Sequence, residues 1–213
     1  SNNPIVVAVP TTLESTFENR AINRTSLQGQ YITNYCGSSN NFSEALIKSS
    51  SHIQNFELTT NFYSVSDEVK KFPPGELFVL RDFHRIGYLL TFATFNDHGV
   101  AQITPEDFFD LLPKLWLGIR ERGDVGSVDV PLMGSRFARI GIDNRKEILR
   151  ELINSFSAAS SEARLADRVT FYIRPADFTR WGFSFEHIER ILDNVCDDHR
   201  RRPTENTSVG KSA

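Results

Sequence analysis

Short apolar runs alternate along this chain with segments of helical periodicity, and this alternation limits the folds open to it more than any other feature. Continuous apolar runs rich in β-branched residues are typical of strands buried on both faces of a parallel sheet. Amphipathic helices between such strands supply the crossovers that parallel pairing needs. The pattern therefore predicts an α/β fold of three layers, α/β/α, around a mixed, largely parallel sheet.

The strands are predicted from apolar or β-branched runs that end at turn-forming residues. The clearest is 5–9 (IVVAV), which Pro10 closes. The others are predicted over 62–65, 76–83, 85–95, 128–132 and 168–173. The polar stretch from Thr11 to Gln30 has no clean periodicity, so we expect a long connection there.

The helices are predicted from capping residues followed by apolar positions at helical spacing. The strongest start is Thr104-Pro105-Glu106-Asp107, with a threonine N-cap, proline at the first helical position and carboxylates in the first turn. Gly123 is expected to end this helix. Three further helices are expected: one over 41–51 capped by Ser43, one from Asp143 to about Ser157, and one capped by Ser184, with Phe185, Ile188, Ile191, Leu192 and Val195 facing inward.

The composition favours a soluble globular protein and excludes partners recruited by a strong overall charge. Of the 213 residues, 39% are hydrophobic and 24% charged, and the formal net charge is −3. We therefore expect no nucleic-acid partner, because no basic excess is available to neutralise phosphates. Cys36 and Cys196 lie too far apart to form a metal-ligand motif, so we expect no metal, no cofactor and a reducing, cytoplasmic compartment.

We expect one domain over residues 1–196 and a polar C-terminal tail over 197–213, because no internal repeat or linker interrupts the chain. The longest apolar stretches are too short to cross a bilayer. The chain begins with serine and its only methionine is Met133, so we expect further residues upstream, and a membrane anchor only there.

The segment 131–141 (PLMGSRFARIG) follows a predicted strand and contains the elements of a phosphate-binding loop. Gly134 allows a close backbone approach and Ser135 offers a hydroxyl, while successive amides can surround an anion. The alternative is a tight strand-to-helix turn with a surface glycine. The predicted contacts come from the backbone more than from the arginines, and the residues are Met133, Gly134, Ser135, Arg136, Phe137, Ala138 and Arg139.

The chain resembles the macro domain family, and more narrowly the divergent macro-like domain of bacterial Thoeris anti-phage effectors. The resemblance covers roughly residues 5 to 195. It is carried by IVVAVPTTLES, SLQGQYI, GYLLTFATFND, PEDFFDLLPKLW and VDVPLMGSRFARIG, in that order along the chain. It implies a macro-like fold that binds ADP-ribose or a derivative in a cleft above a mixed sheet. In some of these effectors the domain follows transmembrane helices.

The resemblance also implies where the ligand lies. Ser26, Leu27, Gln28 and Gly29 would close over the diphosphate from one side, and the loop from Gly134 to Arg139 from the other. Two further groups of residues, each at the end of a predicted strand, would complete the site. They are Pro10, Thr11 and Thr12 near the adenosine, and Thr94, Phe95 and Asn96 along the cleft.

The implied function is that of a sensor. Its ligand would be an ADP-ribose-derived messenger, such as histidine-ADP-ribose or a cyclic ADP-ribose, made by a partner TIR enzyme, and binding would regulate an anti-phage effector. Hydrolytic macro domains carry an Asn- and Gly-rich first loop, whereas Asn23–Gly29 here holds one glycine, so we expect binding without turnover and no catalytic residue. The alternatives are an ADP-ribosyl hydrolase and a scaffold without a small ligand. The sequence leaves the oligomeric state open, a homo-oligomer included.

Overall fold

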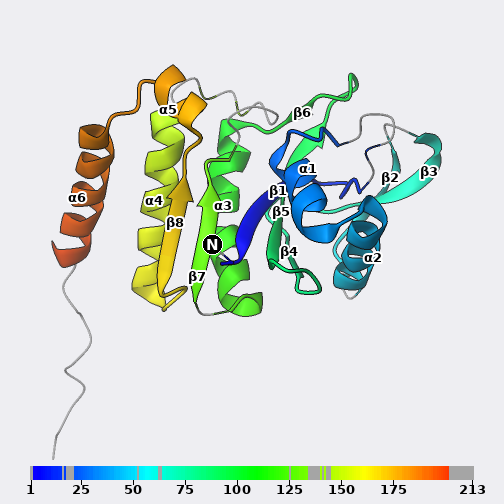
Figure 1. Cartoon of the computed structure of the whole chain (residues 1–213), viewed down its shortest axis with the longest axis horizontal. Helices are drawn as coiled ribbons and strands as arrows, with labels where there is room; N and C mark the ends of the chain where they lie inside the picture. Colours follow the sequence, from blue (N-terminus) through cyan, green and yellow to red (C-terminus); the bar gives the residue numbers. More distant parts are fainter. Residues whose placement is uncertain are drawn as a thin grey trace, which may run out of the picture.

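The computed structural model describes residues 2–15, 17, 22–51, 53–61, 64–124, 126–133, 140, 142 and 145–201. Its centre is a six-stranded sheet in the order β4-β5-β1-β7-β8, with β6 paired to β5 (Figure 1). The neighbours β5, β1, β7 and β8 run parallel, and β4 and β6 are antiparallel to β5. The mixed, largely parallel sheet is therefore confirmed. The strands are β1 Ile5–Pro10, β4 Leu77–Leu80, β5 Gly87–Phe95, β6 Ala101–Gln102, β7 Ser127–Pro131 and β8 Arg168–Tyr172.

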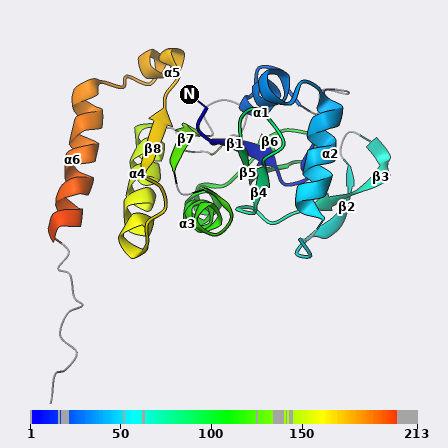
Figure 2. The ribbon, with the colours of Figure 1, turned by 60° about the horizontal axis from the view of Figure 1, so that its bottom comes forward.

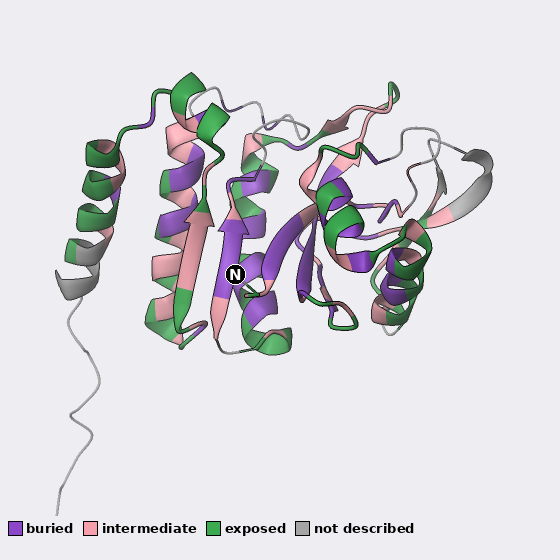
Figure 3. Cartoon of the chain, viewed as in Figure 1, coloured by how far each residue is buried: buried purple, intermediate pink, exposed green. Residues whose placement is uncertain are grey.

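Helices cover both faces of the sheet, which gives the expected three layers (Figure 2). One face packs against α1 (Leu27–Tyr31), its π-helical continuation η2 (Ile32–Cys36) and α2 (Ser39–Ser50). The other packs against α3 (Pro105–Arg122) and α4 (Arg145–Glu162). Each face has its own hydrophobic core, the first beneath α1, η2 and α2 and the second beneath α3 and α4. Side chains alternate along a strand, so Ile5, Val7 and Val9 of β1 lie in the first core and Val6 lies in the second. The central strands are accordingly buried on both sides (Figure 3).

Several predicted elements differ in the structure. The polar stretch expected to be a long connection contains the start of α1 at Leu27. Ser38, rather than Ser43, caps α2, because its hydroxyl accepts the amide of Asn41 at 3.1 Å, whereas Ser43 lies inside the helix. A hairpin of β2 (Glu57–Asn61) and β3 (Ser64–Lys71) replaces the strand predicted over 62–65. Residues 62 and 63 lie outside the described part of the chain.

The C-terminal region also departs from expectation. A short helix α5 (Pro175–Arg180) follows β8, and α6 (Phe185–Arg201) continues past the point where we expect the tail to begin. Only part of the predicted apolar face of α6 is covered: Phe185 is 80% exposed and Leu192 44%. The helix lies beside α4 at the β8 border of the sheet (Figure 1), and Phe178 of α5 contacts Phe185 at its start, so only a narrow stripe of α6 is covered.

Candidate functional site at the carboxyl edge of the sheet

The parallel strands β1, β5 and β7 end at the same edge of the sheet, which we call the carboxyl edge. In open α/β sheets ligands bind outside this edge. The register of β1 and β5 shifts between Val9 and Pro10, and Thr11 then donates its amide to the Ala93 carbonyl at 2.9 Å. The Thr11 carbonyl accepts the amide of Phe72 at 2.9 Å. The loop after β1 is thereby held firmly against the end of β5.

Leu13, in this loop, has a backbone conformation that leucine seldom adopts. Its φ is 51°, and it is the only residue other than glycine with a positive φ among the described residues. A turn in which its amide donates to the Pro10 carbonyl at 3.0 Å fixes this geometry. Such strain costs about 1–3 kcal/mol and persists where surrounding contacts over-determine the backbone, often at ligand sites.

Two buried polar side chains, Glu14 and Gln28, join this loop to the first turn of α1. Each is 5% exposed. The Gln28 amide nitrogen donates to the Glu14 carbonyl oxygen at 2.6 Å, and the Thr12 hydroxyl donates to the Glu14 carboxylate at 3.2 Å. Glu14 and Leu13 were not expected from the sequence, because no residue pattern marks a buried carboxylate or a leucine with a positive φ. A carboxylate here is able to accept hydrogen bonds from hydroxyl or amino groups.

The predicted contact residues Ser26 and Gly29 both have roles within the turn that starts α1. The Ser26 hydroxyl donates to the Asn23 carbonyl at 2.6 Å and accepts the Gly29 amide at 3.0 Å. A Cβ on Gly29 would lie 2.3 Å from the Asn23 carbonyl oxygen, so no side chain fits there. Leu27 is half-buried against the first core. The turn is built by internal hydrogen bonds, and contact of these residues with a ligand stays a prediction.

The predicted residues Thr94, Phe95 and Asn96 lie where β5 ends and turns into β6. Thr94 pairs with Gln102 and Phe95 with Ala101. The Asn96 side chain accepts the amides of His98 and Val100, each at 3.0 Å, so it shapes this turn. All three side chains are half-buried at the carboxyl edge.

The predicted phosphate-binding loop, Gly134 to Arg139, lies outside the described residues, and so does Asp143. The residues that flank the loop are described: Met133 and Ile140 are both buried in the second core. Leu132, just after β7, donates its amide to the Tyr172 carbonyl at 2.8 Å. The chain therefore enters and leaves this loop from fixed, apolar anchors beside the carboxyl edge.

The opposite edge of the sheet, the amino edge, holds a buried ion pair that the sequence analysis did not single out. Asp129 of β7 is fully buried and bonds to the Arg85 guanidinium, whose Nε donates to the Asn3 carbonyl at 2.8 Å. Arg85 also reaches the Tyr35 hydroxyl at 3.1 Å, and its carbonyl accepts the Tyr31 hydroxyl at 2.8 Å. The sequence feature that could have indicated this pair is the single aspartate inside the apolar run VDVPL.

Burial shifts the pKa values of two side chains, Tyr31 at the end of α1 and Cys36 at the end of η2. It raises the pKa of the Cys36 thiol from 9.0 to about 12. Burial, with a smaller contribution from Cys36, also raises the pKa of the Tyr31 hydroxyl. Both groups are therefore neutral at physiological pH, and they serve packing and hydrogen bonding. Among the described residues no three His, Cys, Asp or Glu side chains gather as a metal site, and no helix is apolar over the length a bilayer requires.

Comparison with known proteins gives one family. The model of the family described as "Thoeris protein ThsA, Macro domain" matches residues 1–174. No curated protein matches the chain. The matched span holds every strand of the central sheet and both of its described edges, and it stops before α5 and α6.

Proposed function

The chain belongs to the Thoeris ThsA macro domain family, and from that membership we propose that it binds an ADP-ribose-derived nucleotide signal at the carboxyl edge of its sheet. The adenosine would lie near Pro10, Thr11 and Thr12. The diphosphate would lie between the first turn of α1 and the loop that follows Met133. In this proposal the signal is the product of a partner TIR enzyme, and its binding regulates an effector in anti-phage defence.

The observation that carries the proposal is the strained loop after β1. Leu13 keeps a positive φ, and the loop is fixed by the end of β5 on one side and by Gln28 on the other. A fixed backbone at this edge loses little conformational freedom when a ligand binds, which favours affinity. The same edge receives the anchors of the loop from Gly134 to Arg139.

We propose that the ligand is bound without turnover. The polar groups of the first loop are used in folding: the Asn23 side chain accepts the amide and the hydroxyl of Thr25, each at 2.8 Å, and Ser26 caps α1. Groups held in this way are poorly placed to activate a water molecule. The second candidate is an ADP-ribosyl hydrolase, and the buried Glu14 carboxylate at the same edge is the observation that favours it, since a buried carboxylate is a candidate general base.

Calorimetric titration of the protein with ADP-ribose, histidine-ADP-ribose and cyclic ADP-ribose tests this proposal. We expect saturable binding of at least one of them. At a ligand concentration 100 times Kd, the protein should gain about 2.7 kcal/mol in unfolding free energy, measurable as a higher Tm. Chromatography of the mixture afterwards should return the ligand intact. Cleaved ligand would establish the hydrolase instead, and the absence of heat and of any Tm shift with all three would contradict both functions.

A further inference from the structure

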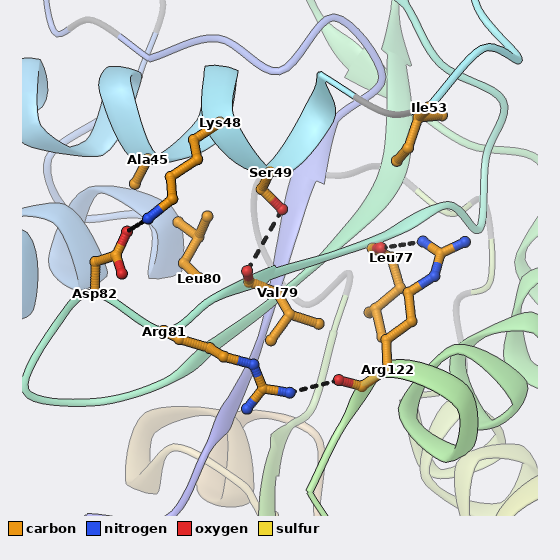
Figure 4. A pocket seen from close by; sticks show the side chains of 10 residues that line it. All are labelled: Ala45, Lys48, Ser49, Ile53, Leu77, Val79, Leu80, Arg81, Asp82 and Arg122. Carbon is orange, nitrogen blue, oxygen red and sulfur yellow. Dashed lines mark hydrogen bonds and ion pairs between the residues drawn. The ribbon is translucent and has the colours of Figure 1, made fainter.

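A groove outside the proposed nucleotide site runs along β4, the border strand of the sheet opposite β8. It lies between α2 and the C-terminal end of α3 and encloses about 330 Å³ (Figure 4). Its floor is apolar, with Ala45, Ile53 and Val79 among the lining residues. We call it the β4 groove, and its role goes beyond the proposed nucleotide binding.

The backbone of β4 offers unused strand-pairing positions to this groove. The Glu76 carbonyl accepts the amide of Thr91 in β5, and backbone groups alternate in direction along a strand. Phe78 and Leu80 therefore bond toward β5, whereas Leu77 and Val79 present their amides and carbonyls outward. No other strand of the described chain pairs with this outer side.

Side chains occupy the places where a neighbouring strand would bond. Arg122 Nη1 donates to the Leu77 carbonyl at 2.5 Å, and the Ser49 hydroxyl donates to the Val79 carbonyl at 3.4 Å (Figure 4). The second distance is long for a hydroxyl donor, so that bond is weak. An arriving backbone amide would replace it with a stronger bond.

The charges of the groove favour an acidic occupant. Lys48, Arg81 and Arg122 line it against one carboxylate, Asp82, although the whole chain carries a net charge of −3. Each cation is already paired: Lys48 with Asp82 at 2.9 Å, Arg81 with Asp124 at 2.7 Å and Arg122 with Glu76 at 2.6 Å. The first two pairs are exposed on both sides, whereas the Glu76 side chain is only 17% exposed. Exposed pairs are worth roughly 0–1 kcal/mol, so incoming carboxylates can exchange with Asp82 on Lys48 and with Asp124 on Arg81 at little cost.

We propose that the β4 groove binds an extended, acidic polypeptide segment of a partner protein, which adds a strand to the outer side of β4. The backbone of the segment pairs with Leu77 and Val79. Alternate side chains point to opposite faces of a strand, so apolar residues of the segment meet the floor while acidic residues reach Lys48 and Arg81.

The test uses a dye-labelled peptide of about nine alternating valine and glutamate residues, whose binding is followed by fluorescence anisotropy. The variant is Val79→Pro, which removes the outward amide, and proline is tolerated on a border strand where its nitrogen faces outward. Val79→Thr keeps the amide and the side-chain shape and is the matched control. We expect the control to bind like the parent and Val79→Pro to bind at least about tenfold more weakly.

Two further changes test the charge contacts and the backbone pairing separately: a charge reversal in the groove and a peptide that cannot pair as a strand. Arg81→Glu should weaken the peptide by about tenfold, and Arg120→Glu, on the same protein but outside the groove, should leave it unchanged. A peptide with proline at its central positions should not bind. ADP-ribose titration of Val79→Pro should match the parent, which separates this test from that of nucleotide binding.

Three results would overturn the proposal. The first is no binding of the peptide to the parent up to about 1 mM. The second is equal binding by Val79→Pro and Val79→Thr. The third is self-association of the parent that Val79→Pro abolishes in light scattering, because the groove would then hold a second copy of this chain.

Discussion

The two edges of the central sheet are built from the same strands, yet they are stabilised in different ways. At the amino edge, side chains carry the structure: Arg85 and Asp129 form a buried pair that also binds Asn3 and Tyr35. At the carboxyl edge, the backbone carries it, through the amide and carbonyl of Thr11 and the strained turn at Leu13.

This difference suggests that the amino edge stabilises the fold and that the carboxyl edge binds the ligand. A fully buried charge pair resists change, because loss of either member leaves an uncompensated charge. A backbone already fixed by its own hydrogen bonds loses little conformational freedom when a ligand binds beside it. We therefore expect substitutions at the amino edge to reduce stability and substitutions in the loop after Met133 to reduce ligand affinity.

The largest expected effect comes from Asp129→Ala. It leaves the buried Arg85 guanidinium without its carboxylate and should lower the free energy of unfolding by about 3–5 kcal/mol. Urea unfolding followed by circular dichroism measures this. Tyr35→Phe, which removes one hydrogen bond to the same guanidinium, is the milder control at about 1 kcal/mol. Equal effects of the two variants would show that the ion pair is not the main support of this edge.

The second prediction concerns affinity. Gly134→Val should weaken ADP-ribose binding by at least about a hundredfold, since a branched side chain would fill the space that the phosphate needs and would penalise positive φ. The unfolding free energy should change by less than about 1 kcal/mol, because the prediction assigns Gly134 to ligand contact and not to the core. Arg136→Ala should be milder if backbone amides make the main contacts. Calorimetric titration of both variants with ADP-ribose measures these affinities. If Gly134→Val bound ADP-ribose as tightly as the parent, the prediction of a phosphate-binding loop would be wrong.

Gly29→Ala tests whether the first turn of α1 contributes both to stability and to ligand affinity. The added Cβ would lie 2.3 Å from a backbone oxygen that cannot move freely, so we expect a loss of about 1–3 kcal/mol in stability. Because Gln28 ties this turn to the loop after β1, ligand affinity should fall too. Gly126→Ala is the matched control, since no atom lies within 4 Å of its added Cβ. A variant as stable as this control would contradict the packing described for Gly29.

The last effect is absent at neutral pH and develops only in alkaline solution. The folded-state pKa of Cys36 is about 12 against a reference value of 9.0, so the unfolded state loses its proton first. Stability from this group is complete below pH 9 and is lost as the pH rises toward 12. Tyr31 acts in the same direction. Unfolding free energies across this window should fall less steeply in Cys36→Ala and Tyr31→Phe, and unchanged slopes would contradict the effect.

Local signals predicted the elements whose determinants are local. The helix α3 follows directly from Thr104, whose hydroxyl accepts the amide of Asp107 at 3.0 Å, and from Pro105 after it. The buried strand β1 follows from a continuous apolar run, and β7 from a short apolar run that Asp129 interrupts. The β2–β3 hairpin was missed because β3 (SVSDEVKK) has too few apolar residues to show a strand period.

The site was predictable only in outline. The sequence indicated which loops reach the carboxyl edge, because strand ends can be read from apolar runs. It did not indicate the positive φ of Leu13 or the burial of Glu14, since no residue pattern marks either; the loop that contains both is held by Ala93 and Gln28. It assigned Gly29 to ligand contact, whereas the structure also requires a glycine there for the close approach of Asn23.

Hydrogen–deuterium exchange with and without saturating ADP-ribose shows which edge of the sheet binds the nucleotide. We expect slower exchange with ligand in peptides that cover 10–15 and 130–142. We expect no change in peptides over 81–86 at the amino edge or over 45–51 in the β4 groove. Protection confined to either of these last two regions, with none after β1 or β7, would contradict nucleotide binding at the carboxyl edge.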